Sequence, residues 1–264
     1  MTALAVAARE RLRVPLVVPA AIAFAWALAV AAEATGHAHQ LHHDALIEDG
    51  PPFALALALF LLAWQVMTAA MMLPSSLPLM RLFASASSSQ PRARAAMAAF
   101  IGGYAVVWSV FGLFAFVGDL GIHRTVDHFA WLHAHEYLIS GGVLVMAGAF
   151  QFSRLKDACL EQCRHPGAFM MRHYARGIDG AFALGRRHGL FCLGCCWALM
   201  LLMFAAGVAN LWWMAALTAL MVYEKTGSGG RRTVPVTGVL LLVWAALVIA
   251  HPAWLPHALS GVES

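Results

Sequence analysis

Three of the five cysteines in this chain lie within five positions of one apolar stretch, HGLFCLGCCWALMLLMFAAGVAN. On a helix, Cys192 and Cys196 are one turn apart, and Met200 and Met203 continue roughly the same stripe over the next turns. Thiolate and thioether sulfur atoms are the soft ligands that select Cu(I). Cys and Met are also common core residues, and the two methionines alone favour that interpretation, but the clustered cysteines favour a metal site. The candidate thiol ligands of this stretch are Cys192, Cys195 and Cys196.

Two further groups of sulfur-containing residues stand at helical spacing. Cys159 and Cys163 are four positions apart in CLEQCRHP, and Met67 and Met71 are four positions apart in WQVMTAAMMLP, where Met72 follows. Each pair would share one face of a helix. A methionine pair at this spacing usually serves packing, so the methionines are candidate ligands only in combination with the cysteines. Together these residues would give Cu(I) a pocket of soft ligands.

A different kind of candidate site lies in residues 35–52, which contain GHAHQLHHD, nearby carboxylates and no Lys or Arg. Imidazole nitrogen and carboxylate oxygen ligate divalent metal ions such as Cu(II) and Zn(II). Two interpretations stand side by side: the histidines capture a metal ion, or the segment is a polar loop that is rich in histidine. The candidate ligands are His37, His39, His42 and His43.

The composition of the 264-residue chain indicates a polytopic membrane protein. Hydrophobic residues make up 61% of it and charged residues 11%, and the mean hydropathy is +0.73; a soluble domain of this size would lack the polar surface to cover itself. The basic residues fall in short segments between apolar runs, which does not indicate a nucleic-acid-binding protein. The first apolar run lacks a convincing small-residue cleavage site, so we expect it to be retained as a span.

The apolar runs predict an all-α membrane bundle of about seven transmembrane helices, in a single domain that covers residues 1–264. The predicted spans are 14–34, 53–73, 98–117, 134–152, 190–208, 211–223 and 236–250. The sixth is short, so it is either a tilted helix or half of a re-entrant pair with the fifth. Pro74 and Pro78 are expected to end or kink the second helix just beyond its methionines. Residues 118–133 and 153–187 are predicted to be loops.

The positions of the basic residues predict the orientation. With the N-terminus in the cytoplasm and seven alternating spans, all of the 17 Lys and Arg residues except Arg124 fall on the cytoplasmic side. This bias favours an N-in, C-out topology in a bacterial inner membrane. It places the His-rich loop 35–52 in the periplasm and the Cys-containing loop 153–187 in the cytoplasm, where structural disulfides are rare. Glu224 and Lys225, at the inner end of the sixth span, either form an ion pair or mark the interface, and the interfacial interpretation is favoured because charges there can reach the headgroups.

Three blocks and a short motif resemble a bacterial family of predicted metal-binding integral membrane proteins. The blocks are WQVMTAAMMLPSSLP, AGAFQFSRLKDACLEQCRHP and HGLFCLGCCWALMLLMFAAGVANLWWM, and the motif is the closing YEK. The resemblance covers roughly Trp64 to Lys225, and its most specific part is the CxGCCW block with the upstream CLxxC. The family includes a copper chaperone-like member that serves a tyrosinase in melanin formation.

The resemblance implies a role with copper and a set of ligand positions. The chain departs from the family pattern at Ala209, where the family has a Met before the Asn, so no ligand is assigned there. The matching positions are Met67, Met71, Met72, Cys159, Cys163, Cys192, Cys195 and Cys196, with Met200 and Asn210 as supporting positions.

The leading hypothesis is a membrane copper-binding protein, without catalytic residues, that takes up, relays or delivers Cu(I) for copper homeostasis or cuproenzyme maturation. Its partners would be the lipid bilayer and a copper enzyme or soluble copper carrier. Zinc also binds thiolate and imidazole but makes no use of Met, so it is less favoured.

Two alternatives stay open. One is a membrane thiol–disulfide oxidoreductase that uses the CxxC spacing of Cys192 and Cys195 at a helix N-terminus, which activates thiols. The other is a structural or assembly subunit whose metal site staples helices.

Overall fold

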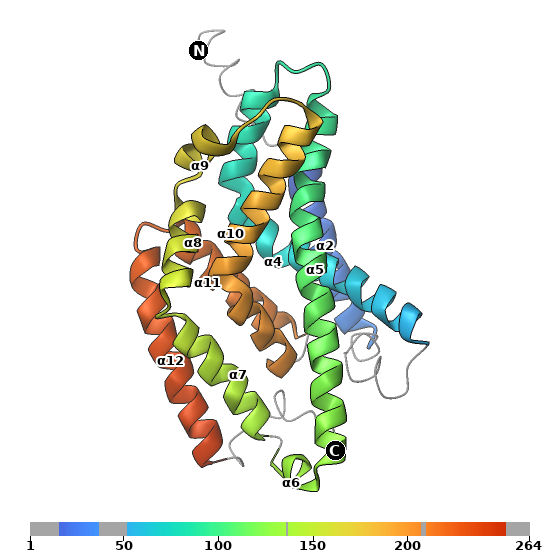
Figure 1. Cartoon of the computed structure of the whole chain (residues 1–264), viewed down its shortest axis with the longest axis vertical. Coiled ribbons are helices and arrows are strands. Elements are labelled where there is room, and N and C mark those ends of the chain that lie inside the picture. Colours follow the sequence, from blue (N-terminus) through green and yellow to red (C-terminus); the bar gives the residue numbers. More distant parts are fainter. Residues whose placement is uncertain (1–15, 37–51, 136, 207–209, 252–264) are drawn as a thin grey trace.

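A computed structural model describes residues 16–36, 52–135, 137–206 and 210–251, and these form a bundle of helices (Figure 1). None of the described residues lies in a strand, so the predicted all-α class is confirmed. Ten helices are described: α2 (Val17–Ala34), α4 (Phe53–Ser87), α5 (Ala93–His128), α6 (Ala130–His133), α7 (Tyr137–Phe150), α8 (Arg154–Arg164), α9 (Pro166–His173), α10 (Gly177–Ala206), α11 (Leu211–Thr226) and α12 (Gly230–Ala250).

Several of these helices are long and apolar enough to cross a bilayer. Within the described residues there are four, namely α2, α4, most of α5 and α12. A fifth is added if α7 and α8, which meet at a bend of 63°, count as one broken span. The structure thus supports membrane association through four or five helices of spanning length, while seven spans and their orientation stay predictions.

The helices extend further than the apolar runs indicated, and two predicted loops are wrong. Residues 118–133 are mostly helical, since α5 continues to His128 and α6 follows. Residues 153–187 form α8, α9 and the start of α10. The hydroxyl of Ser153 caps α8 by accepting a hydrogen bond from the backbone N–H of Lys156 (3.1 Å), and Pro166 opens α9, where proline costs least. These helices are polar on one face, so hydropathy alone does not detect them.

Pro74 and Pro78 do not end the second helix, because α4 continues through both to Ser87. Its first half (cyan) runs obliquely in Figure 1 and its second half (teal) stands upright, as expected for a helix kinked by proline. A proline at position 74 leaves the carbonyl four residues earlier without its helical donor. That carbonyl, of Ala70, accepts a hydrogen bond from the indole N–H of Trp26 on α2 (3.1 Å). Helix α2 therefore satisfies the backbone group that the proline frees.

Helix α10 lies in the middle of the bundle, beside α5, and the two helices run in the same direction (Figure 1). Glycines allow their backbones to come close. A Cβ atom added at Gly185 would collide with the carbonyl oxygen of Phe100, and one added at Gly103 would collide with the carbonyl oxygen of Phe182. Close approach through small residues is the usual way for helices to associate in a membrane.

We expect Gly103→Ala to lower the free energy of unfolding by about 1–3 kcal/mol, because the added methyl group overpacks a backbone contact. Gly102→Ala is the matched control, since a Cβ atom there has nothing within 4 Å. It should be neutral or stabilising by up to about 1 kcal/mol, since alanine favours helix over glycine. Thermal unfolding of the purified protein in detergent, followed by circular dichroism, measures both. Equal changes in the two variants would contradict this packing of α5 against α10.

Helices α4 and α5 are longer than a bilayer is thick. At 35 and 36 residues they reach about 53 Å, against a hydrocarbon core of about 30 Å. Figure 1 shows the α4–α5 turn, α9 and the start of α10 gathered at one end of the molecule. The exposed arginines near this end are Arg81, Arg92, Arg94, Arg172, Arg176, Arg186 and Arg187.

Candidate metal centre

The three cysteines of α10 lie in the middle of that helix and are almost fully buried. Since α10 begins at Gly177, Cys192 stands about four turns beyond its N-terminus. The prediction that Cys192 and Cys195 lie at a helix N-terminus is therefore wrong. The helix N-terminus that would activate a CxxC thiol in the oxidoreductase alternative is too far away to act on them, because its effect falls off within the first turn.

Cys192 and Cys196 face α4 and α11. The Sγ atom of Cys196 lies 3.6 Å from the Sδ atom of Met72 on α4. The Sγ atom of Cys192 lies 3.1 Å from the Nζ atom of Lys225 on α11, and 3.1 Å from the hydroxyl of Tyr104 on α5. These two thiols and the thioether of Met72 form a first sulfur group, to which three helices contribute contacts.

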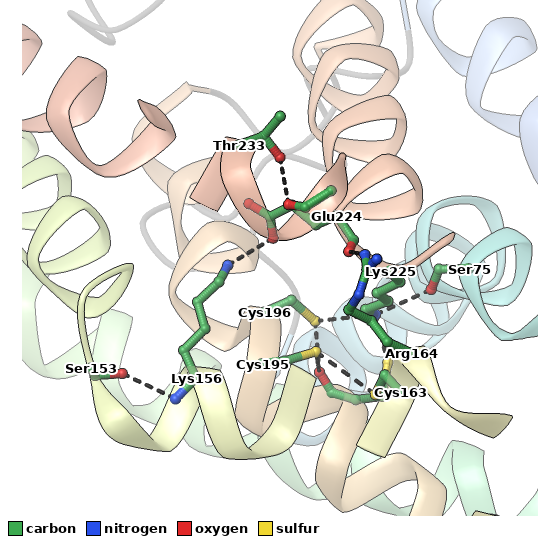
Figure 2. A network of polar contacts seen from close by, with 12 residues as sticks. Ser75, Ser153, Lys156, Cys163, Arg164, Cys195, Cys196, Glu224, Lys225 and Thr233 are labelled. Carbon is green, nitrogen blue, oxygen red and sulfur yellow. Dashed lines mark hydrogen bonds and ion pairs between the residues drawn. The ribbon is translucent and has the colours of Figure 1, made fainter. Parts of the chain in front are cut away.

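Cys195 points to a different neighbour, α8. Its Sγ atom lies 4.0 Å from the Sγ atom of Cys163 (Figure 2), which is the less buried partner. Cys159, one turn earlier on α8, packs against Gly194, where a Cβ atom would come within 2.5 Å of its Sγ atom. Cys163 and Cys195 form a second sulfur pair, on the adjoining face of α10.

The separations within both groups suit a shared metal ion. Two sulfur atoms bound to one ion at roughly 2.3 Å are about 3.8 Å apart at a tetrahedral angle and about 4.6 Å apart in a straight line. The Cys196–Met72 and Cys163–Cys195 distances of 3.6 and 4.0 Å are close to the smaller value. Among the described residues, no three or more His, Cys, Asp or Glu side chains are grouped to hold a metal ion. Any ion bound here would therefore have few protein ligands, with Met sulfur among them.

Charged side chains are buried beside the sulfur atoms, which the interfacial interpretation of Glu224 and Lys225 did not predict. Lys225 is 4% exposed and Glu224 is 2% exposed. The Nζ atom of Lys156, which is fully buried, donates to Oε2 of Glu224 at 2.8 Å (Figure 2). Arg164, next to Cys163 on α8, donates to the carbonyl oxygens of Glu224 and Gly227 at the end of α11. These contacts hold α8 against α11 and thereby keep Cys163 of α8 next to Cys195 of α10.

Polar and aromatic groups cover the sulfur atoms on the side that faces the arginine-rich end of the bundle, which is the end with the α4–α5 turn, α9 and the start of α10. His188 lies one turn before Cys192, and its Nε2 atom is 3.0 Å from the hydroxyl of Ser76. Its ring stacks on Tyr104, with the ring centroids 5.5 Å apart, and meets the edge of Phe169 on α9 at 5.9 Å. Cys192, one turn beyond His188, is fully buried, and such surroundings strengthen electrostatic interactions.

The structure brings some of the predicted ligands together and not others. The Cys196 thiol contacts Met72, the Cys163 thiol contacts Cys195, and the ammonium group of Lys225 lies within 4 Å of both Cys192 and Cys196. The other buried candidate methionines lie in the same apolar core, and in the described part of the chain Met72 is the one whose sulfur contacts a thiol. These methionines are Met67, Met71, Met200 and Met203. The four histidine candidates, His37, His39, His42 and His43, fall outside the described residues.

Asn210, a supporting position by resemblance, has a structural role here. It precedes α11, and its Oδ1 atom accepts hydrogen bonds from the backbone N–H groups of Trp212 (3.1 Å) and Trp213 (3.2 Å). This is an N-cap, the arrangement that Asn favours at a helix start. It fixes the start of the helix whose other end carries Lys225.

The described part of the chain also contains a hollow of about 380 Å³ between α5, α6 and α7. It is mostly apolar, and its nearest part on α5, Gly118, is about 20 Å along that helix from Tyr104. It therefore has no part in the sulfur site. Its lining residues are Gly118, Gly121, Ile122, Thr125, Leu132 and Ile139.

Comparison with known proteins agrees with these features. No curated protein and no solved structure matches the chain. The sequence model of the PpoB2 family, which is described as a copper chaperone, matches residues 61–248. The matched region contains both sulfur groups and the buried charges around them, and it extends the resemblance seen over Trp64 to Lys225. A copper-related chaperone role follows from it, with a copper enzyme or a copper carrier as the implied partner. This chain belongs to the PpoB2 copper chaperone family.

Proposed function

We propose that this protein is a membrane copper chaperone that binds Cu(I) between Cys192, Cys196 and Met72 and passes it to a copper enzyme or a soluble carrier. The observation that carries the proposal is the buried contact of the Cys196 thiol with the Met72 thioether at 3.6 Å. Soft sulfur ligands favour Cu(I). Zinc is less suited to the site, because its protein ligands are Cys, His and carboxylates rather than Met.

The second sulfur pair would serve as the neighbouring station in a relay. Cys163 is partly exposed whereas Cys195 is buried, so an incoming or outgoing ion would meet this pair before the first sulfur group. Cys195 and Cys196 are adjacent on α10, which makes a short step from one group to the other. Passing an ion between weakly coordinated sulfur atoms lets it move without being released to water.

The arginine-rich end of the bundle supports a cytoplasmic location for the sulfur site. Basic residues are retained on the cytoplasmic side of membrane proteins, and the exposed arginines gather around the α4–α5 turn, α9 and the start of α10. With this end in the cytoplasm, the thiols of α10 lie toward the inner leaflet of a bacterial inner membrane. Copper would then be exchanged on the cytoplasmic side, where thiols stay reduced.

X-ray absorption at the copper edge tests the proposed site. Full-length protein loaded with one equivalent of Cu(I) under anaerobic conditions should show a monovalent edge. We expect its first coordination shell to contain sulfur alone, two or three atoms at roughly 2.3 Å. A shell dominated by nitrogen or oxygen would reject the sulfur site and point to the histidines of residues 35–52. Copper delivery is checked separately, by the activity of copper enzymes in cells that lack this protein.

A further inference from the structure

The ammonium group of Lys225 lies inside the sulfur cluster. Its Nζ atom is 3.1 Å from the Sγ atom of Cys192, 3.9 Å from that of Cys196 and 3.1 Å from the hydroxyl oxygen of Ser75. Figure 2 shows the side chain reaching from α11 across to α4 and α10. Among the described residues, the hydrogen-bonding contacts of this cation are therefore with two proposed ligands and one neutral hydroxyl.

In the part of the chain that the structure describes, no salt bridge joins Lys225 to an acidic residue, and the adjacent Glu224 pairs with Lys156 instead. Burying an ammonium group without an opposite charge is costly, so buried cations are normally paired. Cys192 and Cys196 are the groups in contact with Lys225 that can supply negative charge, and a metal ion binds them as thiolates.

We infer that Lys225 sets the net charge of the site and thereby selects a monovalent over a divalent metal ion. This inference rests on the proposed copper site. Two thiolates carry two negative charges and the ammonium group one positive charge, so Cu(I) brings the sum to zero. Zn(II) in the same place would leave one positive charge in surroundings that are almost closed to water, where an uncompensated charge is unfavourable.

The ammonium group and the ion can occupy the site together. The hydroxyl of Ser75 accepts a hydrogen bond from Lys225 on the α4 side, so the lysine stays anchored when a metal ion takes up the thiolates. A metal-bound thiolate still has lone pairs for hydrogen bonds, and such partners tune the affinity of a metal site. Lys225 is thus a specificity-determining residue that does not ligate the ion.

The test compares Lys225→Met, which removes the charge, with Lys225→Arg, which keeps it. Affinities of the purified full-length proteins for Cu(I) and for Zn(II) are measured anaerobically, by competition with coloured chelators of each ion. We expect the ratio of Cu(I) to Zn(II) affinity to fall by about tenfold or more in the Met variant and to be retained in the Arg variant. An equal loss of both affinities in the Met variant, or an equal loss of selectivity in both variants, would overturn the inference.

A second variant adds an opposite charge while leaving the lysine in place. In Ser75→Asp, the new carboxylate would pair with Lys225 and cancel its charge, so the selectivity should again move toward Zn(II). Arg231→Met is the control, because it removes one positive charge from an exposed residue that pairs with Asp157 at the surface, and its ratio should equal that of the wild type. An unchanged ratio in Ser75→Asp would overturn the role of Lys225. Wild-type protein that binds no Cu(I) would instead overturn the proposed function itself.

Discussion

Replacing Cys192 and Cys196 together with serine is expected to lower the Cu(I) affinity of the purified protein by more than about 100-fold, leaving Cys163 and Cys195 as the remaining sulfur pair. Both thiols face the first sulfur group, and the hydroxyl of serine is a hard ligand with little affinity for Cu(I). Loss of a partner outside the ligand shell already lowers metal affinity by roughly 10- to 100-fold, so loss of two ligands should cost more. Copper content by elemental analysis and competition with a Cu(I) chelator measure the effect.

Cys159→Ser is the matched control for that double variant. Cys159 is buried like the α10 cysteines and lies on α8, where it packs against Gly194 rather than facing Met72 or Lys225. Its replacement should leave copper content near the wild-type value. Unchanged copper in Cys192→Ser/Cys196→Ser would contradict the sulfur site, and so would an equal loss in the Cys159→Ser control.

Lys156→Met should be among the most destabilising single changes in the protein. It leaves the carboxylate of Glu224, 2% exposed, without its cation, and breaking a buried ion pair from one side costs about 3–5 kcal/mol. The double variant Lys156→Met/Glu224→Leu should recover most of that loss, because replacing both members of a buried pair with apolar residues is often neutral. Unfolding in detergent by heat or denaturant gives the changes.

The comparison for the buried Lys156–Glu224 pair is the surface ion pair between Arg231 and Asp157. Its charged atoms are 3.1 Å apart, and about 60% of each side chain is exposed. Arg231→Met should change stability by less than about 1 kcal/mol, as exposed pairs usually do. If Lys156→Met were no more destabilising than Arg231→Met, the Lys156–Glu224 pair would not be buried as the structure describes. If the double variant were no more stable than the single one, the carboxylate of Glu224 would not be the source of the loss.

The apolar runs and the cysteine spacing predicted much of this molecule. Long hydrophobic segments indicated the helical class, and the cysteines of α10 indicated a soft metal site. Helix α8 was not predicted because its polar face lowers its mean hydropathy. Its start at Ser153, and that of α9 at Pro166, are nevertheless residues typical of helix starts. The contact of Lys225 with Cys192 was not predicted because the two residues are 33 positions apart. A charged residue at the end of an apolar run is also typical of the membrane interface, and only the packing of the helices shows that this one is buried. Tertiary neighbours of this kind are not visible in local spacing.

The indole of Trp26 gives helix α2 a role in the structure around Pro74. Helix α2 lies before the region that matches the copper chaperone family, residues 61–248, so the match alone assigns it no role. Yet it donates to the Ala70 carbonyl left open above Pro74, close in sequence to Met71 and Met72. Ala70 is fully buried, so loss of this hydrogen bond would leave its carbonyl oxygen unsatisfied, at a cost of about 1–3 kcal/mol. Helix α2, which contains no Cys or Met, thus helps to maintain the bend beside Met72 from outside the region that matches the family.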